Sequence, residues 1–181
     1  MENLPFISCK CITYGRVSTL EESVESFLKQ DYPADKYELI IVNDYPLQTL
    51  VFDHPQVKII NLDKTFDTIG EKENYATELC QGEIICQWDD DDVALPNHLQ
   101  NVVKYMTDNV NIIHWEVGVL CHITGIEHVG WIGNSGIVFR KSAWKAIGGH
   151  PLENAGYDMT FIESINAYGG RLFAKPPKRR S

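Results

Sequence analysis

Four consecutive aspartates at residues 89–92 are the side chains of this chain best suited to chemistry. Carboxylates this close repel one another, and burial raises their pKa values, so they need water or a cation to neutralise them. The apolar run 84–86 leads into them, and Trp88 and Leu95 flank them. We therefore expect a hard divalent cation, Mg²⁺ or Mn²⁺, at the end of a buried strand, with room left for substrate phosphates. A solvated acidic turn is the alternative.

Length and composition limit what the chain can bind. A chain of 181 residues that is 44% hydrophobic is typical of one globular domain. Its net charge of −9 argues against a nucleic-acid partner, because phosphate binding requires a basic face. The basic residues of the tail at 175–181 allow at most peripheral contact with an acidic membrane surface.

We expect no signal peptide at the start of this sequence. Residues 1–5 lack the basic and apolar regions of a signal peptide, and no apolar run is long enough to cross a bilayer. The five cysteines lack the spacing of a zinc site, and four of them lie in apolar runs, which indicates reduced, buried thiols. We expect a cytoplasmic protein, or one held peripherally at the inner face of a membrane.

Strand-like and helix-like segments alternate through the first half of the chain. Apolar runs predict strands at 6–12, 37–42, 57–62 and 83–88. Periodic segments predict helices at 18–30, 71–80 and 96–106. Ser18 with Glu21 predicts a capping box at the start of the first helix. The alternation indicates an α/β sandwich with a mostly parallel sheet flanked by helices.

The second half of the chain is less regular. Short strands are expected at 111–115, 117–120 and 137–139, and helices at 142–147 and 157–168. A glycine-rich stretch at 130–136 lies between them.

Polar residues follow three of the predicted strands directly. Thr13 and Tyr14 end the first strand, Asn43 and Asp44 end the second, and the aspartates at 89–92 end the fourth. Ligands of an open α/β sheet bind beyond the carboxyl ends of its strands, so these residues should meet at one edge of the sheet. The sequence therefore predicts a nucleotide-type ligand beside a metal.

These segments, in this order, resemble glycosyltransferase family 2, whose members are inverting enzymes with the GT-A fold. The resemblance covers about residues 6–170, and a DxD motif alone would be weak support. The matching segments are 12–16, 38–44, 70–76, 82–85 and 89–92 before Pro96. The resemblance implies a single GT-A domain over 1–181. Within it, 1–96 would be the nucleotide-binding half, 97–174 the acceptor-side half and 175–181 a basic tail.

The resemblance also implies roles on the donor side. Thr13 and Tyr14 would line the base pocket, and Asp44 would accept a hydrogen bond from the base, usually uracil. For Asp44, a plain turn residue is the alternative. Arg16, Lys72 and Asn74 lie in the matching segments and join the nucleotide-binding set.

Each aspartate of the acidic stretch has its own expected place. Asp89 would face the ribose, or the metal through water. Asp91 would bind the metal directly, with Asp92 beside it. Asp90 holds the variable middle position, and we expect it near the nucleotide or simply solvated.

One segment departs from the family pattern. Many members have an arginine immediately before the asparagine that corresponds to Asn74, where it approaches the diphosphate, but this chain has Glu73 there and Lys72 before it. Lys72 is the candidate replacement. Neighbouring helix residues differ by a rotation of about 100°, so we expect that Lys72 and Glu73 do not both face the site.

The resemblance places the acceptor site in the second half. Asp158 is the expected catalytic base and Glu153 the second candidate. A carboxylate that only offsets the helix dipole is the alternative for Asp158. Trp131, Gly133 and Asn134 would form the acceptor or donor-sugar floor. His150 is either a third metal ligand or an ordinary exposed or hydrogen-bonded loop residue.

The resemblance thus implies transfer of a sugar from a nucleotide sugar, a UDP-sugar, to a hydroxyl acceptor such as a glycan or polysaccharide, with Mn²⁺ or Mg²⁺ as cofactor. A nucleotidyltransferase is one alternative, although the loop 13–16 is poor in glycine for holding a triphosphate. A non-catalytic nucleotide-sugar binding module, or a truncated transferase, is the other. Product release distinguishes the three.

Overall fold

A seven-stranded sheet with the order β3-β2-β1-β4-β8-β5-β9 forms the middle of the molecule. The structure is a computed structural model that describes residues 4–115, 117–121, 125–130 and 136–174. The strands of the sheet are β1 (Ile7–Thr13), β2 (Tyr37–Asn43), β3 (Val57–Asn61), β4 (Ile84–Gln87), β5 (Ile112–Trp115), β8 (Ile137–Arg140) and β9 (Arg171–Ala174). Strands β1 to β4 run parallel, and β8 runs antiparallel to both of its neighbours.

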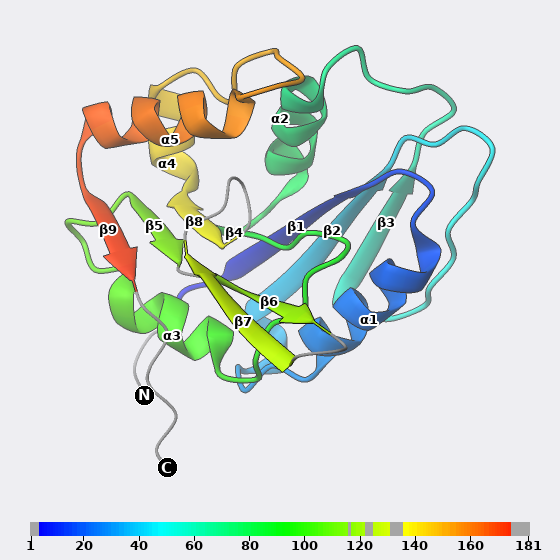
Figure 1. Cartoon of the computed structure of the whole chain (residues 1–181), viewed down its shortest axis with the longest axis horizontal. Coiled ribbons are helices and arrows are strands. Elements are labelled where there is room, and N and C mark those ends of the chain that lie inside the picture. The colour runs from blue at the N-terminus through cyan, green and yellow to red at the C-terminus, as the bar shows by residue number, and fades with distance from the viewer. Residues whose placement is uncertain (1–3, 116, 122–124, 131–135, 175–181) are drawn as a thin grey trace.

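Helices cover both faces of this sheet. Figure 1 shows α2, α4 and α5 over one face and α1 and α3 over the other. The helices are α1 (Val17–Leu28), α2 (Ile69–Leu79), α3 (His98–Tyr105), α4 (Lys141–Ala146) and α5 (Tyr157–Tyr168), with a short 3-10 turn, η1 (Ala34–Lys36). The predicted α/β sandwich is therefore confirmed. None of the helices in the described residues has the length and apolar character needed to cross a membrane.

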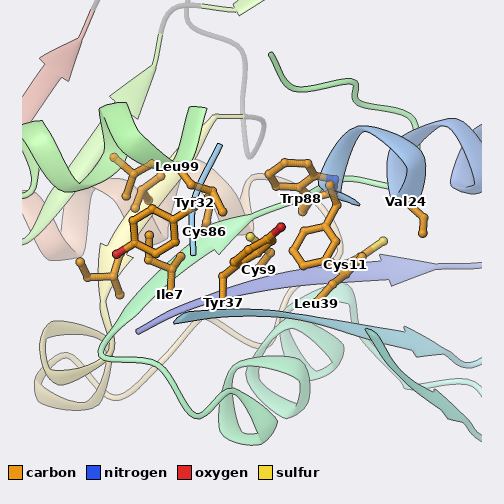
Figure 2. Packing of buried hydrophobic residues seen from close by; sticks show 14 of the residues in the cluster. Ile7, Cys9, Cys11, Val24, Tyr32, Tyr37, Leu39, Cys86, Trp88 and Leu99 are labelled. Atoms are coloured by element: carbon orange, nitrogen blue, oxygen red, sulfur yellow. The ribbon is translucent and has the colours of Figure 1, made fainter. Parts of the chain in front are cut away.

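The strand residues alternate between two apolar layers. Cys9 and Cys11 of β1 pack with Leu39 of β2 toward α1 and α3, and Figure 2 shows the side chains of this layer on one side of the sheet. Ile40 and Val42 point to the other layer, under α2 and α5. Because both faces are covered, β2 reads as a continuous apolar run, as the sequence predicted.

Three local predictions differ from the structure. Strand β7 (Gly125–Gly130), which ends on the first residue of the glycine-rich stretch, was not predicted; it pairs with β6 (Val117–Cys121) in a separate two-stranded sheet. Strand β9 was not predicted, since four residues carry too little pattern, and it exists through parallel pairing with β5. The capping box is wrong: α1 begins at Val17, so Ser18 lies inside the helix and no side chain caps it.

The start of α2 packs tightly on the segment before α5. The backbone N–H of Gly70 donates to the carbonyl of Glu153 at 3.1 Å, and that of Ile69 donates to Asn154 Oδ1 at 2.9 Å. A Cβ on Gly70 would lie 1.7 Å from the carbonyl oxygen of Pro151. Only glycine allows this approach, which fixes the two segments against each other.

This contact predicts that Gly70→Ala destabilises the protein. Alanine in place of glycine normally stabilises a helix by about 0.5–1 kcal/mol. Here the clash with backbone outweighs that gain, and we expect a net loss of about 1–3 kcal/mol. Chemical denaturation measures it, with Glu78→Ala on the exposed face of the same helix as the control. A Gly70→Ala protein as stable as that control would show that the contact yields without cost.

Candidate functional site

Three neighbouring strands end at one edge of the sheet and bring the predicted polar residues together. Thr13 of β1 pairs in register with Asn43 of β2, so Asp44 follows beside it. On the other side of β1, the pair of Lys10 with Gln87 ends the β4 ladder, two residues before Asp89. This edge is the candidate site.

The loop after β1 offers an aromatic surface. Thr13 is buried, whereas Tyr14 is 51% exposed and packs on the ring of Tyr45 with centroids 4.7 Å apart. Gly15, the next residue, has a φ of 74° and turns the chain after Tyr14. A Cβ on Gly15 would lie 3.4 Å from the Tyr45 ring. A flat ring can stack on such a surface.

Asp44 is tied into the protein by two contacts. Its Oδ1 forms an ion pair with Lys72 Nζ, and its Oδ2 accepts from the backbone N–H of Phe66 at 3.1 Å. Lys72 Nζ also donates to the carbonyl of Thr13 at 2.7 Å. Both partners of the ion pair are buried. Lys72 therefore joins α2 to the ends of β1 and β2.

Glu73 also points to the sheet, which corrects the expectation that only one of the two residues does. Its carboxylate pairs with Lys10 Nζ, and both side chains are completely buried. Both neighbouring residues can face the sheet because they contact different parts of β1. Lys72 contacts Thr13 at the end of the strand, whereas Glu73 contacts Lys10 in its middle. Sequence reasoning missed Lys10, whose signal was a lysine inside an apolar strand: such a charge requires a buried partner.

Gln87 connects this buried pair with the acidic stretch. Its Nε2 lies 3.4 Å from Glu73 Oε1 and donates to Asp89 Oδ1 at 2.6 Å. Asp89 is thus oriented from the core side. The turn that follows is closed by a hydrogen bond from the backbone N–H of Asp92 to the carbonyl of Asp89, at 3.2 Å.

The side chain of Arg16 pairs with the two middle residues of the acidic stretch, Asp90 and Asp91. Its Nη2 lies 2.6 Å from Asp90 Oδ1, and its Nη1 lies 2.7 Å from Asp91 Oδ2. Asp90 is 0% exposed, so the expectation that it is solvated is wrong: the turn directs it inward, beneath Arg16. Burial raises the pKa of Asp90, although Thr13 and Arg16 oppose that rise. Partial burial acts to lower the pKa of Arg16, but its two carboxylate partners raise it overall.

The remaining carboxylates suit a hard cation in their chemistry. Asp91 and Asp92 are exposed and Asp89 is partly exposed, so oxygen donors face outward around one turn. Within the described part of the chain, however, no three His, Cys, Asp or Glu side chains already lie together as a metal cluster. These residues can hold a divalent cation only after Asp91 rearranges, since Arg16 contacts it here.

His150 and Asn74 lie in the packing between α2 and the α4–α5 connection. The His150 ring is buried and stacks on Phe161, with centroids 3.7 Å apart, so it is neither an exposed loop residue nor part of a metal cluster. Burial lowers its pKa well below the ordinary value, and nearby Lys10 adds to this. Asn74 Nδ2 donates to the His150 carbonyl at 2.9 Å.

The oxygen of the Asn74 amide completes this connection. Asn74 Oδ1 accepts from the backbone N–H of His150 at 2.7 Å and from Trp144 Nε1 at 3.1 Å. The side chain proposed from sequence for nucleotide binding therefore makes contacts to the protein's own second half. We call the Asn74 contacts with His150 and Trp144 the Asn74 clamp.

Asp158 lies in the first turn of α5, after Gly156 with its φ of 73°. Its Oδ1 accepts from the backbone N–H of Met159 at 2.8 Å. Burial, and the negative charges of Glu73, Asp89 and Asp158, raise the pKa of Tyr157. The segment just before α5 contacts the start of α2, whose Lys72 reaches the carbonyl of Thr13, so the beginning of α5 lies toward the same edge of the sheet.

Other acceptor-side candidates are distributed differently. Glu153 has an exposed side chain, and its backbone holds Gly70. Trp131, Gly133 and Asn134 lie outside the described residues. His114 on β5 was not predicted as a site residue: it is buried, and burial and the charge of Arg171 lower its pKa while the charge of Asp158 opposes them.

Sequence comparison matches the chain to one protein family and to individual glycosyltransferases. The model of Glycosyl transferase family 2 matches residues 10–135. The uncharacterized glycosyltransferase YwdF of Bacillus subtilis (strain 168) is 29% identical over 119 residues, 63% of this chain and 42% of that protein. An uncharacterized glycosyltransferase of Haemophilus influenzae is 30% identical over 120 residues, 62% of this chain and 36% of that protein.

Solved structures share the fold. S. aureus TarS 1–349 superposes with a TM-score of 0.74 at 17% identity, covering 96% of this chain and 58% of that one. The mannosyltransferase PcManGT from Pyrobaculum calidifontis, in complex with GDP-Man and Mn²⁺, gives 0.74 at 20% identity, covering 98% and 56%. The fold is the GT-A glycosyltransferase fold. The chain spans about half or less of the length of the curated relatives it matches.

The Asn74 clamp predicts a stability role for this residue. Asn74→Ala would leave the N–H and C=O of His150 and the Trp144 indole N–H without their partner, and we expect a loss of about 2–3 kcal/mol in unfolding free energy. Urea denaturation measures it. Asn97→Ala is the matched control, because Asn97 is exposed and its side chain makes no capping bond. Equal midpoints for the two variants would contradict a stabilising clamp.

Proposed function

The chain belongs to glycosyl transferase family 2, and on that premise we propose that it is a metal-dependent, inverting transferase that moves a sugar from a nucleoside-diphosphate sugar to a hydroxyl acceptor. The observation that carries the proposal is the common edge of the sheet. The aromatic surface at Tyr14 and the acidic turn at 89–92 follow neighbouring strands there, and the segment before α5 contacts the start of α2 through Glu153 and Gly70. A nucleotide-sugar transferase needs a surface for the nucleobase, a cation site for the diphosphate and a base beside the acceptor, and these three features would supply them.

We propose residues 1–96 as the donor half of this site. Tyr14 would stack on the base above Thr13, with Asp44 and Lys72 presenting charged groups beside it. Two structural neighbours support nucleotide-sugar donors: TarS 1–349 is solved with UDP-GlcNAc and PcManGT with GDP-Man. We propose a UDP-sugar, and a GDP-sugar is the alternative that a donor panel tests.

The residues of the acidic turn would hold Mn²⁺ or Mg²⁺. Asp91 would be a direct ligand, Asp92 would lie beside it, and Asp89 would contact the ion or the ribose while Gln87 orients its carboxylate. When bound, the cation would act as a Lewis acid that offsets the negative charge of the leaving diphosphate. The PcManGT complex with Mn²⁺ supports metal use in this fold.

Residues 97–174 would supply the acceptor half. Asp158 would take the proton of the acceptor hydroxyl. The hydroxyl oxygen of the acceptor would then bond to the anomeric carbon of the donor sugar, while the bond from that carbon to the diphosphate oxygen breaks. Attack opposite to the leaving group inverts the configuration, and the nucleoside diphosphate departs. Glu153 is the second candidate base; its side chain is exposed, and its backbone carbonyl accepts from Gly70. A glycan or polysaccharide hydroxyl is the proposed acceptor.

The first experiment asks for donor turnover. We expect release of nucleoside diphosphate from one member of a panel of UDP-, GDP- and dTDP-sugars with Mn²⁺ and an acceptor mixture, and loss of that release in excess chelator. Asp91→Asn should lower kcat/KM at least about 100-fold, whereas Asp35→Asn, an exposed aspartate in η1, should not change it. Turnover in chelator would refute the metal role. Pyrophosphate release would indicate a nucleotidyltransferase, and binding without release a binding module.

The second experiment separates donor binding from transfer. Asp158→Asn keeps the size of the side chain but loses the base, so transfer should fall about 10²- to 10⁴-fold while the dissociation constant of the nucleoside diphosphate stays the same. Calorimetry measures binding, and product analysis measures transfer. Glu163→Gln, an exposed change on the same helix, is the control. Unchanged transfer by Asp158→Asn would rule this residue out.

A further inference from the structure

We infer that Arg16 competes with the divalent cation for Asp91 and thereby sets the metal affinity of the acidic turn; this rests on the metal site of the proposed function. Arg16 lies in the connection after β1, directly before α1, whereas Asp90 and Asp91 lie in the turn after β4. The guanidinium contacts both carboxylates, with one nitrogen on each at 2.6 and 2.7 Å. It therefore already neutralises the position proposed for the ion.

The two carboxylates hold Arg16 differently. Asp90 is completely buried and binds the guanidinium through two contacts, the ion pair with Nη2 and a hydrogen bond from Nε at 3.1 Å. Asp91 has a side chain that is 49% exposed and binds through Nη1 alone. A buried carboxylate cannot lose its counter-charge cheaply, whereas an exposed one is solvated when its partner leaves.

This asymmetry tells which contact a cation can break. Arg16 stays paired with Asp90, and only its Nη1 contact with Asp91 gives way when Asp91 turns to the ion. Metal binding then carries two costs that an unoccupied carboxylate would not impose: loss of one ion-pair contact and repulsion between the ion and a nearby guanidinium. Removal of Arg16 should therefore tighten metal binding, although it removes a residue from the predicted nucleotide-binding set.

A titration with Mn²⁺ alone tests this, with the free ion followed by its electron paramagnetic resonance signal. We expect Arg16→Ala to bind Mn²⁺ about three- to tenfold more tightly than the unmodified chain, the range that corresponds to one partly exposed ion pair plus relief of charge repulsion. Lys29→Ala is the matched control: it removes the same charge at the opposite end of α1, where Lys29 pairs with exposed Glu25, and it should leave the affinity unchanged.

Two further variants keep the result interpretable. Arg16→Lys retains the charge beside buried Asp90 but loses the planar fork, so it should stay folded and bind Mn²⁺ with intermediate affinity. Arg16→Ala combined with Asp91→Asn should lose the gain, because the competition is for Asp91. Circular dichroism checks that each variant is folded.

The outcomes separate this inference from the proposed function. Equal Mn²⁺ affinity in Arg16→Ala, Arg16→Lys and the unmodified chain would overturn the competition and leave the transferase proposal standing. Tighter binding by Arg16→Ala, together with no sugar transfer by the unmodified chain, would support the competition and count against the transferase. Failure of every protein to bind Mn²⁺ would overturn both.

Discussion

A lysine with no exposed surface in the middle of the sheet needs a negatively charged partner, and the candidate site is built around this buried ion pair. Lys10 of β1 pairs with Glu73 of α2, and both side chains are completely buried. A buried charge without its partner costs several kcal/mol, so the pair fixes the position of α2 over β1. Gln87 extends the same polar layer to Asp89. The orientation of the first acidic residue of the turn thus depends on a charge pair deep in the core.

Two more ion pairs repeat this arrangement toward the edge of the sheet. Lys72 neutralises Asp44, and Arg16 neutralises Asp90. Each cation joins segments that are far apart in the sequence, and each paired carboxylate is buried. In the acidic turn the exposed carboxylates are those of Asp91 and Asp92, and Arg16 also contacts Asp91. The exposed negative charge of this edge therefore lies at its surface, on the side from which a divalent cation would approach.

Much of this architecture could be predicted from sequence, because it rests on patterns that are local. The apolar runs of β1, β2 and β4 and the polar residues after them predicted both the sheet and the edge at which the candidate site lies. What could not be predicted depends on distant partners. Strand β9 pairs with β5, which is distant in the sequence, and buried Asp90 pairs with Arg16, which precedes it by 74 residues. Lys10 and Glu73 were each visible as unusual residues, but nothing local says that they meet.

The role of Asn74 shows the same limit from the functional side. A sequence motif placed it with the nucleotide, whereas its amide contacts the backbone of His150 and the indole of Trp144. A motif identifies a residue that a site needs, yet it does not distinguish a residue that touches the ligand from one that fixes the surroundings. Only the three-dimensional contacts separate the two.

The close approach of Gly70 to Pro151 has a consequence for building hybrids of this protein with its relatives. Together with the Asn74 clamp, it makes the beginning of α2 and the residues 149–154 two halves of one fitted joint. A crossover point placed anywhere between them would combine an α2 from one parent with a facing loop from another, and their shapes would no longer match. Exchange of acceptor specificity between parents would therefore have to carry this joint across as a unit, or leave it wholly in place and graft only what lies beyond it.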